Sequence, residues 1–423
     1  MPTVTMNSDL LEANVTTETK HPPLMGLAVL MRRLFAGEDL TPLAQQLLAR
    51  ASADDHDANA LMDLSVVLQF RGQRDVALAL QGQALAITRR YRLKGSQPTT
   101  LRVLVLMAPG DLMANAPLEF LVEDSDVLLE MLYLRPGEAL PASVPDHDLV
   151  FVAVGESEQN IPLLRQLDAW LRSWPRPVIN RPAAIARLGR DAVCHLLADV
   201  AGATIPAVTR VGRPILEVLA GIAGDALTPP NDGVFPFIVR PVDSHAGHGL
   251  AKAEGREDVR GYLSGQSGHE FYLTPFIDYR SADGLYRKYR IVLIEGRAYA
   301  AHLAISGDWM IHYLNAGMDL SEAKRAEEAD FMRDFDGAFG RRHEAALRAI
   351  HQRVGLDYFA IDCGETPLGE LVIFEVDSSM VVHALDSLAL FPYKQAQMRK
   401  VFGAFRALLD HALETGAQGD VQL

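Results

Sequence analysis

The segment DYFAIDCGETPLGELVIFEVDSS, residues 357–379, contains two apolar runs separated by a turn that Gly364 and Gly369 bound. Apolar runs of this length on either side of a glycine-containing turn predict a β-hairpin. Asp362 lies in the first run, whereas Glu375 and Asp377 lie two residues apart in the second, so these two side chains share one face of their strand. Closure of the hairpin brings Asp362 opposite them.

Three carboxylates that converge on one face of a sheet repel one another in apolar surroundings. A hard divalent cation relieves this repulsion, and Mg²⁺ is typically held by one or two carboxylates together with phosphate oxygens. The alternative interpretation is an acidic strand that faces solvent, which the apolar neighbours in FAIDC and VIFEVD make less favourable. Spacing alone leaves both interpretations open.

Two regions with different strand patterns surround this hairpin. Strand-like runs at 102–108, 127–134 and 148–155, followed by helical spacing at 161–174, predict a parallel, doubly wound sheet. A proline-rich break at 175–182 precedes a region with the pattern of an α+β domain rich in antiparallel strands. There we expect helices at 182–201, 319–353 and 392–414, and strands at 208–211, 237–240, 271–278, 289–306 and 357–379, with a turn at Glu295-Gly296.

The N-terminal quarter of the chain lacks strand patterns. Residues 1–23 are polar and predict a flexible arm, whereas residues 24–93 have helical spacing and 94–98 resemble a linker. The stretch around Gly72 resembles one tetratricopeptide repeat, with Leu64, Ala77 and Ala84 at its small and apolar positions. Such repeats need about three copies to be stable alone, so a helical cap and a peptide-binding module both stay open.

Two further segments have the composition of anion-binding sites. In FIVRPVDSHAGHGL, residues 237–250, a strand ends at Arg240 and leads into a glycine-containing loop, which fits either a phosphate cradle or a tight turn. In the segment at 286–317, Arg287, Lys288, Arg290 and Arg297 place positive charge around one strand of an acidic protein. Phosphate or carboxylate would suit these cations, although a solvated edge strand is favoured for Arg297. His302, His312 and Asn315 follow, and each alone is more typical of a hydrogen-bonded structural residue.

Composition excludes several classes of protein. The 423 residues carry 40 basic and 54 acidic side chains, a net charge of −14, which argues against a nucleic-acid binder. Cys194 and Cys363 form neither a disulfide framework nor a zinc pattern. The apolar runs are too short to cross a bilayer, and the N-terminus lacks a secretion signal. We therefore expect a cytoplasmic protein without a membrane or nucleic-acid partner.

The order of the segments resembles the ATP-grasp superfamily, and more closely its glutathione synthetase and ribosomal-protein-S6 ligase branch. The shared order is a helix, an Arg-Pro strand with a glycine loop, a linker strand, a Lys-Tyr-Arg strand, and a hairpin carrying Asp and Glu-Val-Asp. The resemblance covers about residues 100–410. It implies an α/β and α+β multidomain fold, with a pre-ATP-grasp α/β domain at 98–180 and an ATP-grasp domain at 181–423, which follow the helical region expected at 24–97.

The resemblance also implies roles for individual residues. Asp362, Glu375 and Asp377 correspond to the Mg²⁺ ligands, Asp377 standing where the family usually has Asn. Arg190 and Arg240 stand where phosphate-binding lysines are common, and Arg290 corresponds to the arginine that binds the acyl phosphate or γ-phosphate. The glycine-rich flap corresponds to Ser244, His245, Gly247 and Gly249. The adenine-binding linker corresponds to Leu273, Thr274, Phe276 and Ile277, with Asp278 as a candidate for the ribose.

The activity that the resemblance implies is ATP-dependent ligation of a carboxylate to an amine through an acyl phosphate. Its substrates would be small molecules or peptides, a peptide or protein partner could bind the N-terminal helices, and homo-oligomers are usual in this branch. Two alternatives stay open: a non-catalytic protein that senses nucleotide and binds a partner, and phosphoryl transfer without ligation.

Overall fold

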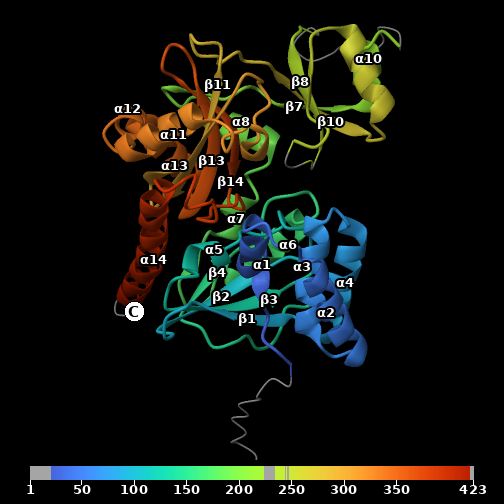
Figure 1. The fold of residues 1–423 in the computed structure, drawn as a ribbon, viewed down its shortest axis with the longest axis vertical. Helices are drawn as coiled ribbons and strands as arrows, with labels where there is room; N and C mark the ends of the chain where they lie inside the picture. Colours follow the sequence, from blue (N-terminus) through green and yellow to red (C-terminus); the bar gives the residue numbers. More distant parts are fainter. Residues whose placement is uncertain (1–20, 223–233, 243, 245–246, 420–423) are drawn as a thin grey trace, which may run out of the picture.

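The computed structural model describes residues 21–222, 234–242, 244 and 247–419, and in this part the chain forms three β-sheets with helices around them (Figure 1). The predicted mixed α/β class is therefore confirmed, while the domain boundaries stay predictions. Every helix in the described part is too short or too polar to cross a membrane. Of the residues predicted to bind the cofactor, His245 lies outside the described residues.

The N-terminal region is helical, as predicted. It comprises α1 (Gly26–Phe35), α2 (Thr41–Ala53), α3 (Ala58–Phe70) and α4 (Arg74–Ile87). Helices α3 and α4 form a hairpin in which Gly72 adopts a φ of 73°, a left-handed conformation that favours glycine, and Ala77 and Ala84 are fully buried. The predicted helix hairpin is thus present, and its assignment as a tetratricopeptide repeat stays a prediction.

The first sheet has the order β1-β3-β2-β4-β5. Its strands are β1 (Arg90–Lys94), β2 (Leu101–Met107), β3 (Val127–Tyr133), β4 (Leu149–Val152) and β5 (Val178–Ile179), and all are parallel except β1. Leu104 and Leu106 pack with α6 (Ile161–Leu171), whereas Val103 and Val105 pack on the opposite face, which includes α5 (Glu119–Val122). Both faces are covered, as the prediction of a doubly wound sheet requires.

Strand β1 corrects the sequence interpretation, which took residues 90–94 as the end of a helix and the start of a linker. Its backbone pairs antiparallel with β3, and Tyr91 is buried between more exposed neighbours. The alternation in Arg-Tyr-Arg-Leu-Lys is a strand pattern too short to stand out after a long helical run. Strand β1 thus makes the end of the N-terminal region part of the first sheet.

The second sheet is antiparallel and lies apart from the others, at the upper right of Figure 1. Its order is β7 (Thr209–Gly212), β10 (Glu270–Pro275), β8 (Phe237–Pro241) and β9 (Ala251–Ala253). Helices α9 (Arg213–Leu219) and α10 (Arg256–Gly265) cover one face, where Leu216, Val259 and Phe271 contribute to a small separate core. The sheet thus carries β8 and its glycine loop on a structural unit of its own.

The third sheet has the order β12-β11-β13-β14-β6. Its strands are β12 (Arg297–Ser306), β11 (Tyr286–Ile294), β13 (Tyr358–Glu365), β14 (Leu371–Asp377) and β6 (Ala203–Thr204). Both predicted hairpins are present: β11 turns into β12 through Glu295 and Gly296, which have φ values of 48° and 80°, and β13 pairs antiparallel with β14. The remaining elements are a 3-10 helix at Tyr313–Asn315 and helices α11 (Glu322–Asp334), α12 (Phe339–Arg342), α13 (Glu344–Val354) and α14 (Lys394–Gly419).

The helix expected at 182–201 is broken in two. Helix α7 (Pro182–Ile185) ends before Gly189, and α8 (Arg190–Leu197) begins directly after it. Gly189 has the extended backbone of a residue that precedes a helix, with φ −51° and ψ 141°. As a result, Arg190 is the first residue of a new helix instead of an interior position.

Two carboxylates, the fully buried Asp63 and the partly buried Glu119, hold the beginning of α1. Asp63 of α3 accepts hydrogen bonds from the backbone N–H groups of Met25 and Gly26, both at 3.0 Å, and Glu119 accepts one from Ala28 at 2.9 Å. Burial raises the pKa of Asp63 to about 6 and that of Glu119 to about 7, even though these hydrogen bonds favour the charged forms. Ionisation of either group therefore costs folding free energy.

This arrangement predicts that Glu119→Gln flattens the dependence of stability on pH. Because the folded pKa is raised, Glu119 contributes fully below its unfolded pKa of about 4.3, and that contribution is lost as the pH rises through about 7. Gln keeps an acceptor for Ala28 and does not ionise, so we expect it to stabilise the fold by about 1–3 kcal/mol at pH 8 and much less at pH 5. Urea unfolding at both pH values measures this, with Glu123→Gln as the control. Equal effects of Glu119→Gln at the two pH values would contradict the prediction.

Candidate active site

A cavity of about 550 Å³ lies between the second and third sheets and extends to α1. Arg240 and Thr274 line it from the second sheet, Arg290 and Glu375 from the third, and Phe35 from α1. The cavity thus brings together segments from the N-terminal helices and from the second and third sheets. Most of the residues that the sequence singled out lie around it.

Strand register gathers the polar side chains on one face of the third sheet. Arg290 of β11 pairs with His302 of β12 and with Asp362 of β13, and Asp362 pairs with Glu375 of β14. Residues paired across antiparallel strands point to the same face, and Asp377 shares that face because it follows Glu375 by two positions. The hairpin therefore places Asp362 opposite Glu375, as its sequence indicated.

Asp362 is almost completely buried and is held by two cations. Arg290 donates to both of its oxygens, at 2.8 and 3.0 Å, and Lys288 Nζ lies 2.7 Å from Oδ2. Burial alone would raise the pKa of Asp362, but Arg290 and Lys288 hold it well below its usual range. Arg290 also donates to the carbonyl of Val381 at 3.0 Å, so its guanidinium has a fixed orientation.

Glu375 and Asp377 differ in their electrostatic surroundings. Glu375 forms an ion pair with Arg190, and although burial opposes ionisation, this partner keeps the Glu375 pKa below its usual value. Burial raises the pKa of Asp377 to about 6, the nearby charge of Glu375 contributes to the rise, and a hydrogen bond from the N–H of Ser379 at 2.8 Å partly offsets it. Added positive charge between the two carboxylates would therefore be favourable.

These carboxylates do not form a closed metal cage. Among the described residues, the trio of acidic or histidine donor atoms that lie within 4.8 Å of one another belongs to Asp54, Asp55 and His56, far from the hairpin in sequence. The hairpin carboxylates still fit Mg²⁺, since this ion needs only one or two protein carboxylates when phosphate oxygens complete its shell. Their role as metal ligands stays a prediction.

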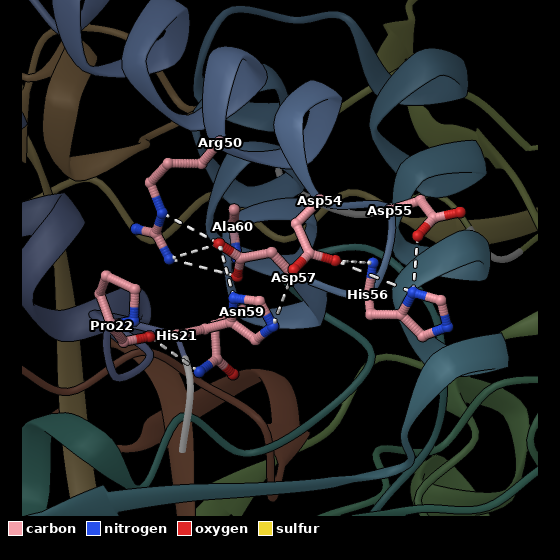
Figure 2. A network of polar contacts seen from close by, with 9 residues as sticks. All are labelled: His21, Pro22, Arg50, Asp54, Asp55, His56, Asp57, Asn59 and Ala60. Atoms are coloured by element: carbon pink, nitrogen blue, oxygen red, sulfur yellow. Dashed lines mark hydrogen bonds and ion pairs between the residues drawn. The ribbon is translucent and has the colours of Figure 1, made fainter. Parts of the chain in front are cut away.

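The loop at 54–57 has a structural explanation (Figure 2). Asp54 accepts a hydrogen bond from the N–H of His56 at 3.0 Å, and the His56 ring lies 2.6 Å from Asp55. Asp57 caps α3 by accepting from Ala60 N–H at 2.9 Å, and it also pairs with Arg50. These contacts close the turn between α2 and α3, and the side chains of Asp55 and His56 are mostly exposed.

Arg240 connects the second sheet to the glycine loop. Its Nε donates to Ser244 Oγ at 3.0 Å, and a second nitrogen contacts the backbone oxygen of Ser244. Burial, together with the neighbouring charge of Arg190, lowers the pKa of Arg240 to about 10. An anion bound between the two guanidinium groups would relieve their repulsion.

Gly247 and Gly249 of this loop adopt φ values of 75° and 65°, which favour glycine. A Cβ atom on Gly249 would lie only 2.7 Å from Pro241 Cδ, so no other residue fits there without movement of the loop. The sequence signal that placed a glycine loop after β8 therefore corresponds to a real conformational requirement.

The predicted adenine linker lies partly on the cavity. Thr274, Phe276 and Ile277 line it, at the end of β10 and just beyond. Leu273 is buried in the core of the second sheet, and Asp278 pairs with Arg280 at 3.0 Å outside the cavity lining. These placements favour the backbone of Phe276 and Ile277 over Leu273 and Asp278 as contacts for a ligand.

Several residues that line the cavity were not assigned to the site from the sequence. Lys288 shares the face of Arg290 by period-two spacing, whereas Arg287 points away and pairs with Asp283 and Glu327. The period of two along residues 286–290 could have predicted that Lys288 and Arg290 share one face. The cavity is also lined by His302, His312 and Asn315, and by His383, Asp386 and Lys394, for which no local motif exists.

No family model and no curated protein matches the sequence. Solved structures with a similar arrangement include two ligases. The D-alanine-D-alanine ligase from Coxiella burnetii has 10% sequence identity and a TM-score of 0.46, over 76% of this chain and 97% of that one. The D-Ala:D-Ser ligase VanG from Enterococcus faecalis has 13% identity and a TM-score of 0.39, over 72% of this chain and all of the other.

Proposed function

We propose that the protein is an ATP-dependent carboxylate-amine ligase of the ATP-grasp type, and that the cavity is its active site. The observation that carries the proposal is the single sheet face on which Arg290, Asp362 and Glu375 meet, with Arg240 and its glycine loop across the cavity. A site that binds a nucleoside triphosphate with Mg²⁺ needs cationic side chains for the phosphates and carboxylates for the metal ion. The order of the sequence motifs supports the same proposal.

In the proposed reaction the substrate carboxylate attacks the γ-phosphate of ATP, giving an acyl phosphate and ADP. The amine, as its free base, then forms a bond to the acyl carbon, phosphate leaves with the electron pair of the C–O bond, and the proton lost from nitrogen passes to the departing phosphate or to solvent. Mg²⁺ held by Glu375 and Asp377, with Asp362 beside them, would neutralise charge on the phosphate oxygens. Such chemistry depends mainly on positioning and charge neutralisation, which the residues around the cavity supply.

The residues of the chain have distinct roles in this proposal. Arg240 and Arg190 bind phosphate oxygens, and Ser244 couples Arg240 to the loop that covers them. Arg290 binds the transferred phosphoryl group, in an orientation fixed by Asp362 and by the carbonyl of Val381. Closure of the loop excludes water, which matters because an acyl phosphate is readily hydrolysed.

One observation favours a second candidate, a protein that senses nucleotide without catalysis. Both oxygens of Asp362 already receive hydrogen bonds from Arg290, and Glu375 is paired with Arg190. Cations could then satisfy the carboxylates without a metal ion. In this alternative the helical N-terminal region recruits a partner when nucleotide binds.

Measurement of ADP release from Mg-ATP distinguishes these functions. A ligase should release ADP in quantity only when both an acid and an amine from a substrate panel are present. Nucleotide binding without turnover across the panel would favour the sensor, and ADP release with a phosphorylated product and no amine requirement would indicate simple phosphoryl transfer. Calorimetric titration of ATP with and without Mg²⁺ comes first, because absence of ATP binding would exclude the ligase, the sensor and the phosphoryl-transfer functions alike.

Replacement of Arg240 by Ala is expected to weaken the affinity for Mg-ATP by about 10- to 100-fold, the equivalent of one or two charge-assisted hydrogen bonds. Calorimetry measures this directly. Arg210→Ala is the matched control, since Arg210 and Arg240 lie opposite the same residue, Tyr272 of β10, on the two strands that flank β10. Arg210 pairs with Glu158 and Glu270 and does not line the cavity. Equal affinities of the two variants would show that other residues bind the phosphates.

A further inference from the structure

One end of the cavity has an apolar wall to which the N-terminal helical region contributes. Phe35, at the end of α1, leaves 40% of its surface exposed, and its ring lies edge-on to that of His383 with 5.1 Å between centroids. The lining there also includes Met31, Met113, Met380 and Val382. A surface of this composition binds apolar groups and offers no partner for a small polar side chain.

Helix α1 is held firmly in this position. Ala28 packs with Phe120 and Leu385, and Met31 and Val381 pack around them. The backbone hydrogen bonds to Asp63 and Glu119 fix its first turn. The α1 part of the apolar wall is therefore a preformed part of the cavity, even though α1 precedes the proposed phosphate-binding residues by about 150 positions or more.

Beside the apolar wall lies an acidic group. Lys394, only 2% exposed, lies 3.3 Å from Glu328 Oε1 and 3.2 Å from Asp386 Oδ2, so one buried cation faces two carboxylates. Asp386 lines the cavity, whereas Glu328 also accepts hydrogen bonds from Tyr313 and Tyr393, at 3.0 and 2.7 Å. Burial lowers the pKa of His383 to about 4, so this neighbour adds no positive charge near neutral pH. Within the cluster of Lys394, Glu328 and Asp386 the carboxylates outnumber the cation, which suits a ligand ammonium at Asp386.

This acidic group adjoins the proposed phosphoryl site. His302 pairs with Arg290 across the strands, its ring lies 4.7 Å from that of Tyr313, and Lys394 lies 4.0 Å from the Tyr313 ring. Asp386 and Arg290 line the same cavity, so an amine that leaves Asp386 as the free base can approach an acyl phosphate at Arg290 through that cavity. Reaction requires the nitrogen to come within about 3–3.5 Å of the acyl carbon.

We infer that this end of the cavity is the subsite for the amine substrate, and that it selects a primary amine with a large apolar or aromatic side chain. The ammonium is held at Asp386, and the side chain lies against Phe35 and Met31. Because Phe35 and Met31 belong to α1, the N-terminal helical region contributes to specificity. The inference deepens the proposed ligase function and rests on it for the identity of the reaction, but binding of the amine can be measured independently.

The test is calorimetric titration of L-phenylalaninamide and of glycinamide into the full chain, without nucleotide and with saturating Mg²⁺ and a non-hydrolysable ATP analogue. Both probes carry the same amine and no carboxylate. We expect L-phenylalaninamide to bind at least about tenfold more tightly, because burial of a phenyl ring in a preformed apolar site contributes more than one order of magnitude. Comparable affinities would overturn the inference.

Single substitutions test which residues cause the preference for L-phenylalaninamide over glycinamide. Phe35→Ala should remove most of the difference between the probes, and Asp386→Asn should weaken both. Leu34→Ala is the matched control, since Leu34 is also 40% exposed on α1 but does not line the cavity, and it should retain the preference. A preference that survives Phe35→Ala, or that Leu34→Ala abolishes equally, overturns the subsite. Retained amine preference in a protein that fails to bind nucleotide would instead support the subsite and exclude the ligase.

Discussion

Glu375→Gln is expected to reduce ATP turnover by at least about 100-fold while the protein stays folded. The substitution keeps the shape of the side chain but removes the charge that the proposed Mg²⁺ and phosphates require, and loss of one such electrostatic group typically costs about 10²- to 10³-fold in rate. Glu375 also pairs with Arg190, which keeps access to solvent and does not become a buried unpaired cation. The change should therefore affect activity far more than stability.

Glu365→Gln is the matched control for this experiment. Glu365 lies on the same hairpin and pairs with Arg342 and His343, but it does not line the cavity. Rates of ADP release and urea midpoints are measured for both variants with the substrates that support turnover. Wild-type turnover by Glu375→Gln, or an equal loss in Glu365→Gln, would remove Glu375 from the catalytic assignment.

The Glu375→Gln variant also tests the electrostatics of the hairpin. Burial is the main reason why the pKa of Asp377 is raised to about 6, and the Glu375 charge adds to it. Removal of that charge should lower the Asp377 pKa, which NMR of the carboxyl carbon can follow. Since the unfolded value is about 3.9, a lower folded value means that less stability is lost as the pH rises from about 4 to 6.

The parts of the site that depend on local sequence were predictable. Asp362, Glu375 and Asp377 lie on strands joined by a short turn, so their common face follows from the period of two. The glycines after Arg240 likewise reported a backbone conformation that only glycine adopts without strain. Within such segments, a few residues determine both the conformation and the direction of the side chains.

The apolar wall and the acidic group were not predictable in the same way. Phe35 and His383 are separated by almost 350 residues, and neither belongs to a motif, so only the packing of α1 against the loop before α14 brings them together. The sequence around Lys394 is typical of an exposed lysine at the start of a helix, but in the structure Lys394 is buried next to Glu328. Long-range packing of this kind leaves no periodic signal in the sequence.

Asp362→Asn is expected to destabilise the fold by about 3–5 kcal/mol at pH 7, because Asp362 is almost completely buried and its loss leaves two partly buried cations, Arg290 and Lys288, without their shared counter-charge. The folded pKa of Asp362 is lowered, so its contribution is present above the unfolded pKa of about 3.9 and is lost as the pH falls below that value. The difference between wild type and variant should therefore shrink in acid. Urea unfolding at pH 7 and pH 3 measures both effects.

Burial can be separated from ion-pair geometry by comparison with Asp126→Asn. Asp126 accepts a bidentate pair from Arg406 at 2.8 and 3.0 Å, the same distances as in the Arg290 pair, but it is 22% exposed. Removal of that charge should cost about 1 kcal/mol or less, as for other exposed pairs. Adding Lys288→Met to Asp362→Asn removes one of the two unpaired cations and should recover part of the lost stability. Equal costs at Asp126 and Asp362, without recovery in the double variant, would mean that the buried cations find other partners and that Asp362 does not hold Arg290 in place for the phosphoryl group.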